Sequence, residues 1–271
     1  MPLETDLKKR LSVALVLIPL TLLCLFSAPI FLRQIVVFTL TLVMVHEWSL
    51  MTKVPYSLLV SPFVATILFF MTLIGPRFFF YEHTLLHHGL AYIFVLLPFI
   101  VVYGKNYTLF TFGYFYITCA MLFLSTHMMD PQLVLWMLIL IWSNDSFAYF
   151  IGKKLKGPKL WINISPNKTW SGFLGGMICG SLFSGGVADF YDIVPHPYLL
   201  SLFLSCIGHG GDLLESAVKR HYKVKDSGNL LPGHGGFLDR LDSLIAVLWG
   251  YSLYKCVTVF LDTTPFFQGY S

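Results

Sequence analysis

The chain has 271 residues, of which 56% are hydrophobic and only 12% are charged, and its mean hydropathy is +0.72. Soluble domains carry about 25% charged residues, so this composition excludes an ordinary soluble domain and predicts an integral membrane protein. The formal net charge is only +4, and we expect no nucleic-acid partner.

The apolar residues fall into long runs that predict an all-α protein. A helix needs about 20 apolar residues to cross a bilayer. About nine segments approach that length, at 11–32, 34–51, 57–74, 90–104, 107–129, 131–151, 170–188, 197–211 and 242–261. The first follows Lys8-Lys9-Arg10 but exceeds the apolar core of a signal peptide, which has about 7–15 residues. We therefore expect one polytopic membrane domain over 1–271, with N-terminal helices in 1–130 and the site-bearing helices and loops in 131–271.

The basic residues predict the orientation of these helices. With a cytoplasmic N-terminus and nine alternating helices, only Arg33 and Arg77 of the 18 Lys and Arg residues fall on the opposite side, and Lys255 lies within the last helix. Basic residues concentrate in cytoplasmic loops, so this arrangement is favoured. Two basic cytoplasmic loops result, at 152–169 and 212–241, and we expect them to form the site.

The polar residues are densest at 211–243, which reads GDLLESAVKRHYKVKDSGNLLPGHGGFLDRLDS. Its first ten residues predict a helix that carries Asp212, Glu215, Ser216 and Lys219 on one face. LPGHGG has turn chemistry, and FLDRLDS opens the last helix with two acids three residues apart, Asp239 and Asp242. The alternative for Asp242 is an ordinary cap, which the helix dipole favours.

Carboxylates among cations at the membrane edge indicate chemistry with phosphates. Charges at the edge of the hydrocarbon are costly and tend to be functional. Oxygen ligands without a His/Cys cluster suit Mg²⁺ rather than zinc, and Lys and Arg nearby suit a metal-bound polyphosphate. The alternative, in which the bases only set the topology, leaves the carboxylates without a role.

The other basic loop leads into a helix with hydroxyls and a lysine at its start. Ser165, Lys168, Thr169 and Ser171 lie there, and Asp145 precedes the loop near the end of an apolar helix. Such a helix start suits a phosphate, although an ordinary N-cap explains the pattern equally well. Glycines at 172, 176 and 180 predict close helix packing, with a wall open to a ligand as the alternative.

Three histidines and Glu47 are further candidates outside these loops. His83, His87 and His88 fall in a non-cytoplasmic loop, and we do not expect a metal site there. Glu47, near the cytoplasmic end of the second helix, is expected to have a structural role, such as pairing with Lys53. The alternative for Glu47 is to line the cytoplasmic cavity.

Residues 216–242 resemble the signature of the phosphatidate cytidylyltransferases, or CDP-diacylglycerol synthases. The chain matches S-x-x-K-R-x4-K-D-x-G-x2-L-P-x-H-G-G-x-x-D-R-x-D, and G-D-L-x-E-S, S-P-x-K-T-W-x-G-F and D-x-x-A-Y-x-x-G nearby are also similar to the family. The resemblance covers about 145–243. The family commonly has Lys and Glu where this chain has Asn167 and Ser171, and Gln where it has His209.

The resemblance implies a reaction in which CTP and phosphatidic acid give CDP-diacylglycerol and pyrophosphate. It implies Mg²⁺, with a second, monovalent cation as an open option, a homodimer, and a bacterial-type inner membrane with the site facing the cytoplasm. Positioning and charge stabilisation explain most of such a transfer. Rival hypotheses are a nucleotidyl- or phosphotransferase for another lipid, such as a polyprenyl phosphate, and an anion transporter, although transporters place their charges near the bilayer midplane.

The resemblance also implies roles for individual residues. The expected catalytic residues are Asp212, Asp239, Lys219, Arg240 and Asp226. The expected metal ligands are Asp212, Asp239 and Asp242. The expected substrate-binding residues, which would hold the triphosphate or the lipid phosphate, are Lys168, Ser165, Thr169, Ser216, Arg220, Lys225, His234, Gly235, Gly236 and Asp145.

Overall fold

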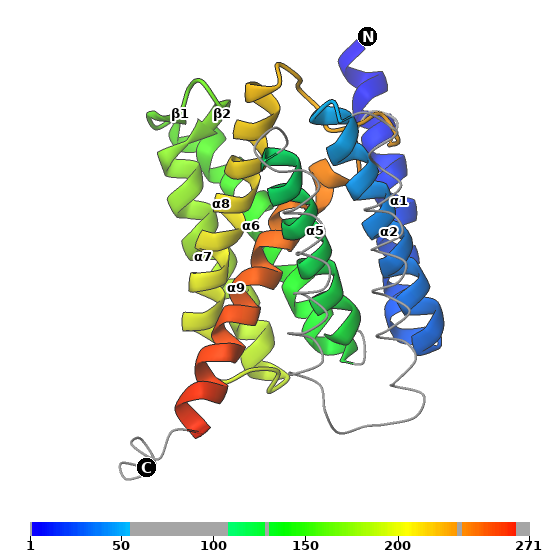
Figure 1. Cartoon of the computed structure of the whole chain (residues 1–271). Helices are drawn as coiled ribbons and strands as arrows, with labels where there is room; N and C mark the ends of the chain where they lie inside the picture. Colours follow the sequence, from blue (N-terminus) through cyan, green and yellow to red (C-terminus); the bar gives the residue numbers. More distant parts are fainter. Residues whose placement is uncertain (1, 55–107, 128–129, 232–234, 264–271) are drawn as a thin grey trace. The chain divides into compact units, whose positions relative to one another are not determined.

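The structure is a computed structural model in which residues 2–54, 108–127, 130–231 and 235–263 are described. Most of these residues are helical, as Figure 1 shows. The helices are α1 (Pro2–Ser27), α2 (Ile30–Met51), α5 (Thr108–His127), α6 (Pro131–Leu155), α7 (Trp170–Phe190), α8 (Pro197–His221) and α9 (Leu238–Thr263). The predicted helical architecture is therefore confirmed for these parts of the chain.

Five helices are long and apolar enough to cross a membrane, which supports the predicted integral membrane protein. These segments are Ile30–Met51, Thr108–His127, Pro131–Leu155, Trp170–Phe190 and Leu238–Phe260. In α1 the segment Leu15–Ser27 is apolar but shorter, and in α8 polar residues interrupt the apolar sequence. The predicted segments 57–74 and 90–104 lie outside the described residues, so the count of nine stays a prediction.

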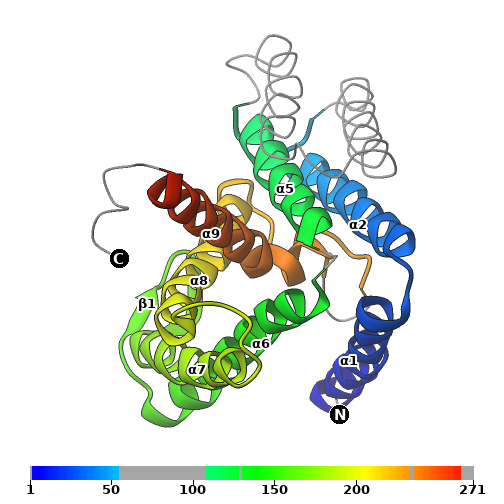
Figure 2. The ribbon, with the colours of Figure 1, turned by 90° about the horizontal axis from the view of Figure 1, so that it is seen from below.

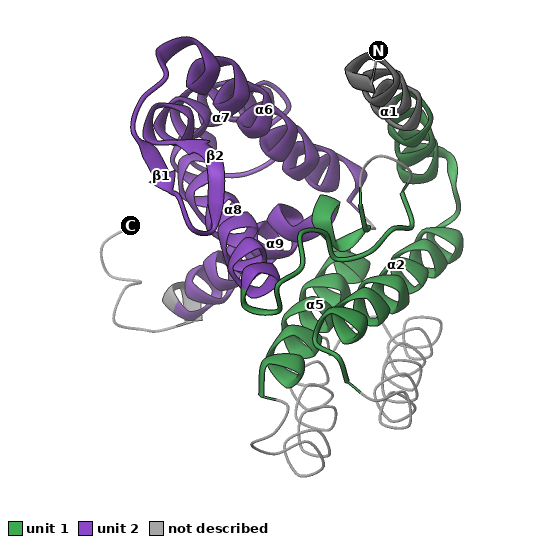
Figure 3. Ribbon diagram, turned by 90° about the horizontal axis from the view of Figure 1, so that it is seen from above, with its two compact units in different colours: residues 1–128, 221–240 green, residues 129–220, 241–271 purple. Residues whose placement is uncertain are grey.

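The chain divides into two compact units, which Figure 3 colours separately. Unit 1 comprises residues 1–128 and 221–240, and unit 2 comprises residues 129–220 and 241–271. Unit 1 therefore contains a segment that is distant in sequence from its helices. The division falls within α9, whose first three residues belong to unit 1.

Unit 1 is built around α2 and α5. The indole of Trp48 on α2 lies against Gly113 on α5, where a Cβ atom would come within 1.8 Å of the ring. Met44 and Val37 of α2 and Tyr114 of α5 are buried nearly completely. Close packing of an aromatic side chain against a glycine brings the two backbones together and buries the apolar stripes of both helices.

Unit 2 contains a tight pair of helices, α6 and α7, which lie side by side in Figure 2. A Cβ atom at Gly176 would lie 2.7 Å from Ala148 Cβ, and one at Gly180 would lie 2.0 Å from Asn144 Oδ1. Trp136 on α6 donates its indole N–H to the carbonyl of Ser184, at 3.1 Å. The glycine spacing thus serves close helix packing, as predicted. The alternative, a glycine wall open to a ligand, is wrong because α6 covers this face of α7.

The basic loop between α6 and α7 forms a small hairpin, which the all-α prediction did not include. Strands β1 (Lys159–Trp161) and β2 (Ser165–Thr169) pair antiparallel. The hairpin begins after Lys156, which ends α6 with a left-handed φ of 47°. The N–H of Trp170 donates to the carbonyl of Pro158 at 2.9 Å. This contact joins the start of the hairpin to the start of α7.

Candidate active site

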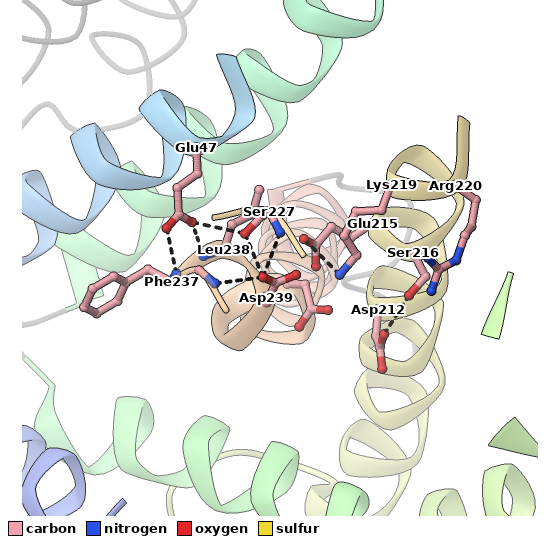
Figure 4. Close-up of polar contacts among 12 residues, drawn as sticks. Glu47, Asp212, Glu215, Ser216, Lys219, Arg220, Ser227, Phe237, Leu238 and Asp239 are labelled. Carbon is pink, nitrogen blue, oxygen red and sulfur yellow. Dashed lines mark hydrogen bonds and ion pairs between the residues drawn. The ribbon is translucent and has the colours of Figure 1, made fainter. Parts of the chain in front are cut away.

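The predicted polar face of α8 is present in unit 2. Ser216 donates to Asp212 Oδ1 at 3.4 Å, and Lys219 Nζ lies 3.3 Å from Glu215 Oε1 (Figure 4). Both pairs are four residues apart, so each joins successive turns of one helix. The helix and its arrangement of side chains are therefore confirmed.

Asp212 also pairs with a side chain from the hairpin. Lys168 of β2 donates to Asp212 Oδ2 and forms an ion pair with it. The two side chains are 28% and 29% exposed, so the pair is accessible to a soluble ligand. Lys168, which we expected to hold phosphate, here holds a carboxylate, and Asp212 has a cation and a hydroxyl as partners.

A buried group of charges lies beside this pair. Glu215 and Lys219 are 5% and 8% exposed. Asp242 of α9 is within hydrogen-bonding reach of Glu215 and interacts electrostatically with Asp212. Buried negative charge is costly unless a cation offsets it. Lys219 offsets part of the charge of these acids.

Asp242 is not the cap of the last helix. α9 begins at Leu238, so Asp242 lies within the helix and accepts from the N–H of Ser243, at 2.7 Å. The prediction that residues 237–243 open the last helix is confirmed, and the charged first turn precedes the apolar run that begins at about residue 242. Asp242 therefore has an internal position from which its carboxyl faces those of α8.

The other predicted residues of unit 2 lie on the hairpin, on α6 and at the end of α8. Thr169 caps α7 by accepting from the N–H of Gly172 at 3.1 Å, which confirms the ordinary N-cap. Arg220 donates from Nε to the carbonyl of Ile164, at 3.2 Å, and so connects α8 to the hairpin. Ser165 is half-buried on β2, and Asp145 is exposed on α6.

His209, one of the departures from the family pattern, lies one turn before Asp212 on α8. Its ring is 7% exposed and packs against Phe173 of α7, with 5.2 Å between the ring centroids. Its Nε2 has no hydrogen-bond partner among the described residues. The imidazole thus fills the space between the two helices close to the Lys168–Asp212 pair.

In unit 1, Asp239 joins residues 226–231 to residues 235–239, and these two stretches are here called the signature loop. Asp239 Oδ2 accepts from the N–H of Ser227 at 2.8 Å, from its hydroxyl at 2.9 Å and from the N–H of Gly236 at 2.9 Å. Gly235 adopts a left-handed φ of 84°, and a Cβ atom there would lie 2.7 Å from Asp239 Oδ2. One carboxylate oxygen therefore accepts hydrogen bonds from both stretches of the signature loop.

The signature loop has a second carboxylate at its centre, from Glu47 of α2. Glu47 is 1% exposed and accepts from the N–H of Phe237 at 3.0 Å and of Leu238 at 2.8 Å (Figure 4). The expected pairing with Lys53 is replaced by these backbone contacts, while the structural role is confirmed. The only sequence signal for this contact was an acid near the end of an apolar helix.

The predicted metal ligands do not form a three-ligand cluster. No group of three or more His, Cys, Asp or Glu residues suitable for a metal ion occurs within the described ranges. Asp239 belongs to unit 1, whereas Asp212 and Asp242 belong to unit 2. Mg²⁺, however, commonly takes only one or two carboxylates and completes its coordination with water and substrate phosphates, so the oxygen donors of Asp212 and Asp242 fit it.

The remaining predicted site residues lie outside the described residues or are exposed in unit 1. His234 lies outside the described residues, as do the histidines at 83, 87 and 88. Lys225, Asp226 and Arg240 are exposed in unit 1. Their exposure leaves all three accessible to a ligand in solution, and the two cations suit an anionic one.

Comparison with known proteins agrees with the resemblance in the signature. The Cytidylyltransferase family matches residues 8–258 of the chain. A phosphatidate cytidylyltransferase of Bacillus subtilis (strain 168) is 54% identical over 114 residues, which is 41% of this chain and 42% of that relative. One of Staphylococcus aureus (strain COL) is 44% identical over 131 residues, or 47% of this chain and 50% of that relative.

A phosphatidate cytidylyltransferase of Staphylococcus haemolyticus (strain JCSC1435) is likewise 44% identical over 131 residues. The chain thus spans about half the length of the curated relatives it matches. The family match, in contrast, extends over most of the chain. This chain belongs to the cytidylyltransferase family.

Proposed function

We propose that the chain transfers CMP from CTP to phosphatidic acid and releases pyrophosphate. The observation that carries this proposal is the family match over residues 8–258, together with relatives named phosphatidate cytidylyltransferase. The structure supports it through paired carboxylates and cations at the ends of apolar helices. Such an arrangement suits a reaction between two phosphates, one of which belongs to a lipid.

The chemistry requires positioning more than proton transfer. An oxygen of the lipid phosphate bonds to the α-phosphorus of CTP, and the bond from that phosphorus to the oxygen bridging to the β-phosphate breaks. Pyrophosphate leaves with that oxygen. The nucleophile is already anionic, so the protein must mainly hold two polyanions together and offset the charge that develops.

The residues of unit 2 would serve this chemistry with charges. Asp212 and Asp242 would hold Mg²⁺, which supplies positive charge to the phosphate oxygens when bound. Lys168 would exchange its contact with Asp212 for a phosphate oxygen, and its ammonium is exposed enough to do so. Lys219 would keep Glu215 neutralised while the substrates bind.

The residues of unit 1 would add N–H donors and further charge. Gly235 carries a backbone N–H group in the signature loop, Gly236 would act through Asp239, to which its N–H donates, and we assign Asp239 to the metal as in the family signature. Lys225, Arg240 and Asp226 are exposed and would contact the triphosphate or orient the groups that do. Arg220, Ser165, Thr169, Ser216 and Asp145 would support the phosphates from unit 2.

The finer architecture is part of the same proposal. We propose nine membrane helices in one domain over 1–271, with the N-terminus and both basic loops in the cytoplasm of a bacterial cell. The protein would lie in the inner membrane, where its loops have access to CTP, and would assemble as a homodimer. The concentration of Lys and Arg in the two loops supports this orientation.

The assay uses purified protein in detergent with CTP, Mg²⁺ and phosphatidic acid. Formation of pyrophosphate and a CDP-lipid in equal amounts is the expected result. Product with a polyprenyl phosphate but not with phosphatidic acid would show that the substrate assignment is wrong. Absence of nucleotide turnover with either lipid would contradict the transferase activity itself.

A further inference from the structure

The start of α9 is capped by a residue from the other end of the chain. A helix begins with backbone N–H groups that have no partner within the helix, and these are normally capped by a neighbouring side chain. Here Glu47 accepts from the N–H groups of Phe237 and Leu238, which are 190 and 191 residues away. A carboxylate at this position is also favoured by the helix dipole.

The signature loop is shaped to fit the Glu47 carboxylate. A Cβ atom at Gly228 would lie 2.7 Å from Glu47 Oε1, and one at Gly236 would lie 2.5 Å from Glu47 Oε2. At such distances either the carboxylate or the loop would have to move. The glycines therefore allow the backbone to close around an acid that is itself almost fully buried.

Ser227 connects this carboxylate to Asp239. Its hydroxyl lies 3.2 Å from Glu47 Oε2 and 2.9 Å from Asp239 Oδ2, and its N–H also donates to Asp239. The N–H of Gly236, next to the two N–H groups that Glu47 holds, also donates to Asp239. Glu47 thus contacts the Ser227 hydroxyl directly and holds the two residues that follow Gly236, while Ser227 and Gly236 orient Asp239.

We infer that Glu47 is a positioning residue for the transfer reaction and acts by fixing the direction of the Asp239 carboxylate. This inference rests on the proposed function and on the role assigned to Asp239. Misplacing a reacting group by about 1 Å can lower a rate about 100-fold. Glu47 would thereby give the second membrane helix a part in a reaction whose other assigned residues begin at Asp145.

The main test replaces Glu47 by Gln. The amide keeps the size of the side chain, but its NH₂ group cannot accept from Phe237 or Leu238, so part of the cap is lost. We expect kcat to fall at least tenfold and the Mg²⁺ concentration for half-maximal activity to rise, while KM for CTP changes by less than about threefold, because ground-state binding is little affected. Amide hydrogen exchange in 227–240 should become faster.

A matched control on the same helix is Thr41→Val. Thr41 is fully buried, and its hydroxyl donates within α2 to the carbonyl of Val37, at 2.7 Å. Removing this buried hydroxyl leaves the signature loop untouched. Activity, Mg²⁺ dependence and exchange in 227–240 should remain as in the unaltered chain.

A second pair of variants keeps the test decisive if Glu47→Gln folds poorly. Gly228→Ala should lower kcat and speed exchange in 227–240, because its methyl group displaces the Glu47 carboxylate. Adding Gly228→Ala to Glu47→Ala should cause little further loss, because the displaced group is already gone. Full additivity of the two effects would contradict the inference, since independent sites add.

The exchange and kinetic measurements separate the possible failures. If Glu47→Gln lowered only the unfolding temperature and kept kcat and exchange unchanged, Glu47 would be a stabilising residue only and the inference would be wrong. If the unaltered chain made no CDP-lipid, the proposed function would fail. In that case, unchanged exchange in Glu47→Gln would show that Glu47 does not hold the signature loop. Faster exchange would show that Glu47 holds the loop, although its part in the reaction would be refuted.

Discussion

Lys168 on strand β2 forms an ion pair with Asp212 on helix α8, 44 residues further along the chain. Each side chain is a little less than one-third exposed. Pairs of this exposure contribute modestly to stability, about 0–1 kcal/mol. The contact is therefore better explained by the chemistry of the two residues than by the stability of the fold.

The ion pair predicts that Lys168→Met impairs catalysis without unfolding the protein. Loss of the ammonium removes a cation that we assign to the phosphates, so kcat/KM should fall about 100-fold, as is typical for one stabilising group in an active site. The measurement is initial rate against CTP concentration, alongside the unfolding temperature. Lys153→Met is the control, because Lys153 is exposed and contacts Tyr149; a similar loss there would indicate a general charge effect.

The buried Glu215–Lys219 pair predicts a loss of stability when only its cation is removed. Lys219→Met leaves Glu215 without its lysine, and breaking such a pair costs about 3–5 kcal/mol. The double variant Lys219→Met/Glu215→Gln should regain much of that free energy of unfolding. Thermal unfolding in detergent measures both variants. Equal unfolding temperatures for Lys219→Met and the unaltered chain would show that the pair is not strongly coupled.

The glycine face of α7 predicts that a side chain at Gly180 separates two membrane helices. Gly180→Val would place its Cβ 2.0 Å from Asn144 Oδ1 and 2.9 Å from the Asn144 backbone, and overpacking typically costs about 1–3 kcal/mol. The control is Gly186→Ala on the same helix, where a Cβ atom would meet only the Tyr198 hydroxyl, at 3.8 Å. Gly186→Ala should unfold at or above the temperature of the unaltered chain, and Gly180→Val clearly below it.

Removal of divalent metal is predicted to abolish turnover. Treatment with EDTA should stop CDP-lipid formation, and Mg²⁺ should restore it, because oxygen ligands of this kind suit Mg²⁺. A binding readout is available through Asp212→Asn, which should lower the affinity for Mg²⁺ in titration calorimetry with CTP present. Full activity in excess EDTA would contradict the assignment of the carboxylates to a metal.

Features set by short-range spacing could be predicted from the sequence. The polar face of α8 follows from intervals of three and four residues, and the close packing of α6 and α7 follows from glycines four residues apart. Both patterns depend only on the period of a helix. The structure confirms them at Ser216–Asp212 and at Gly180–Asn144.

Features that depend on distant contacts or on helix boundaries could not be predicted in the same way. The hairpin has one strand of three residues and one of five, too short to give a periodic signal. The alternative of Asp242 as a cap rested on the helix dipole alone, whereas α9 starts at Leu238 and Asp242 lies within it. The contact of Glu47 with Leu238 joins segments with no shared local pattern, so the sequence could identify an unusual acid but not its partner.

The measurement that tests the account most directly follows the products of CTP in the presence of phosphatidic acid. Purified protein should convert CTP, with Mg²⁺, into pyrophosphate and CDP-diacylglycerol in equal amounts, and Asp212→Asn should reduce this conversion at least 100-fold. An Asp212→Asn variant with unchanged turnover would contradict the site. An unaltered chain that forms no CDP-diacylglycerol would contradict the proposed function.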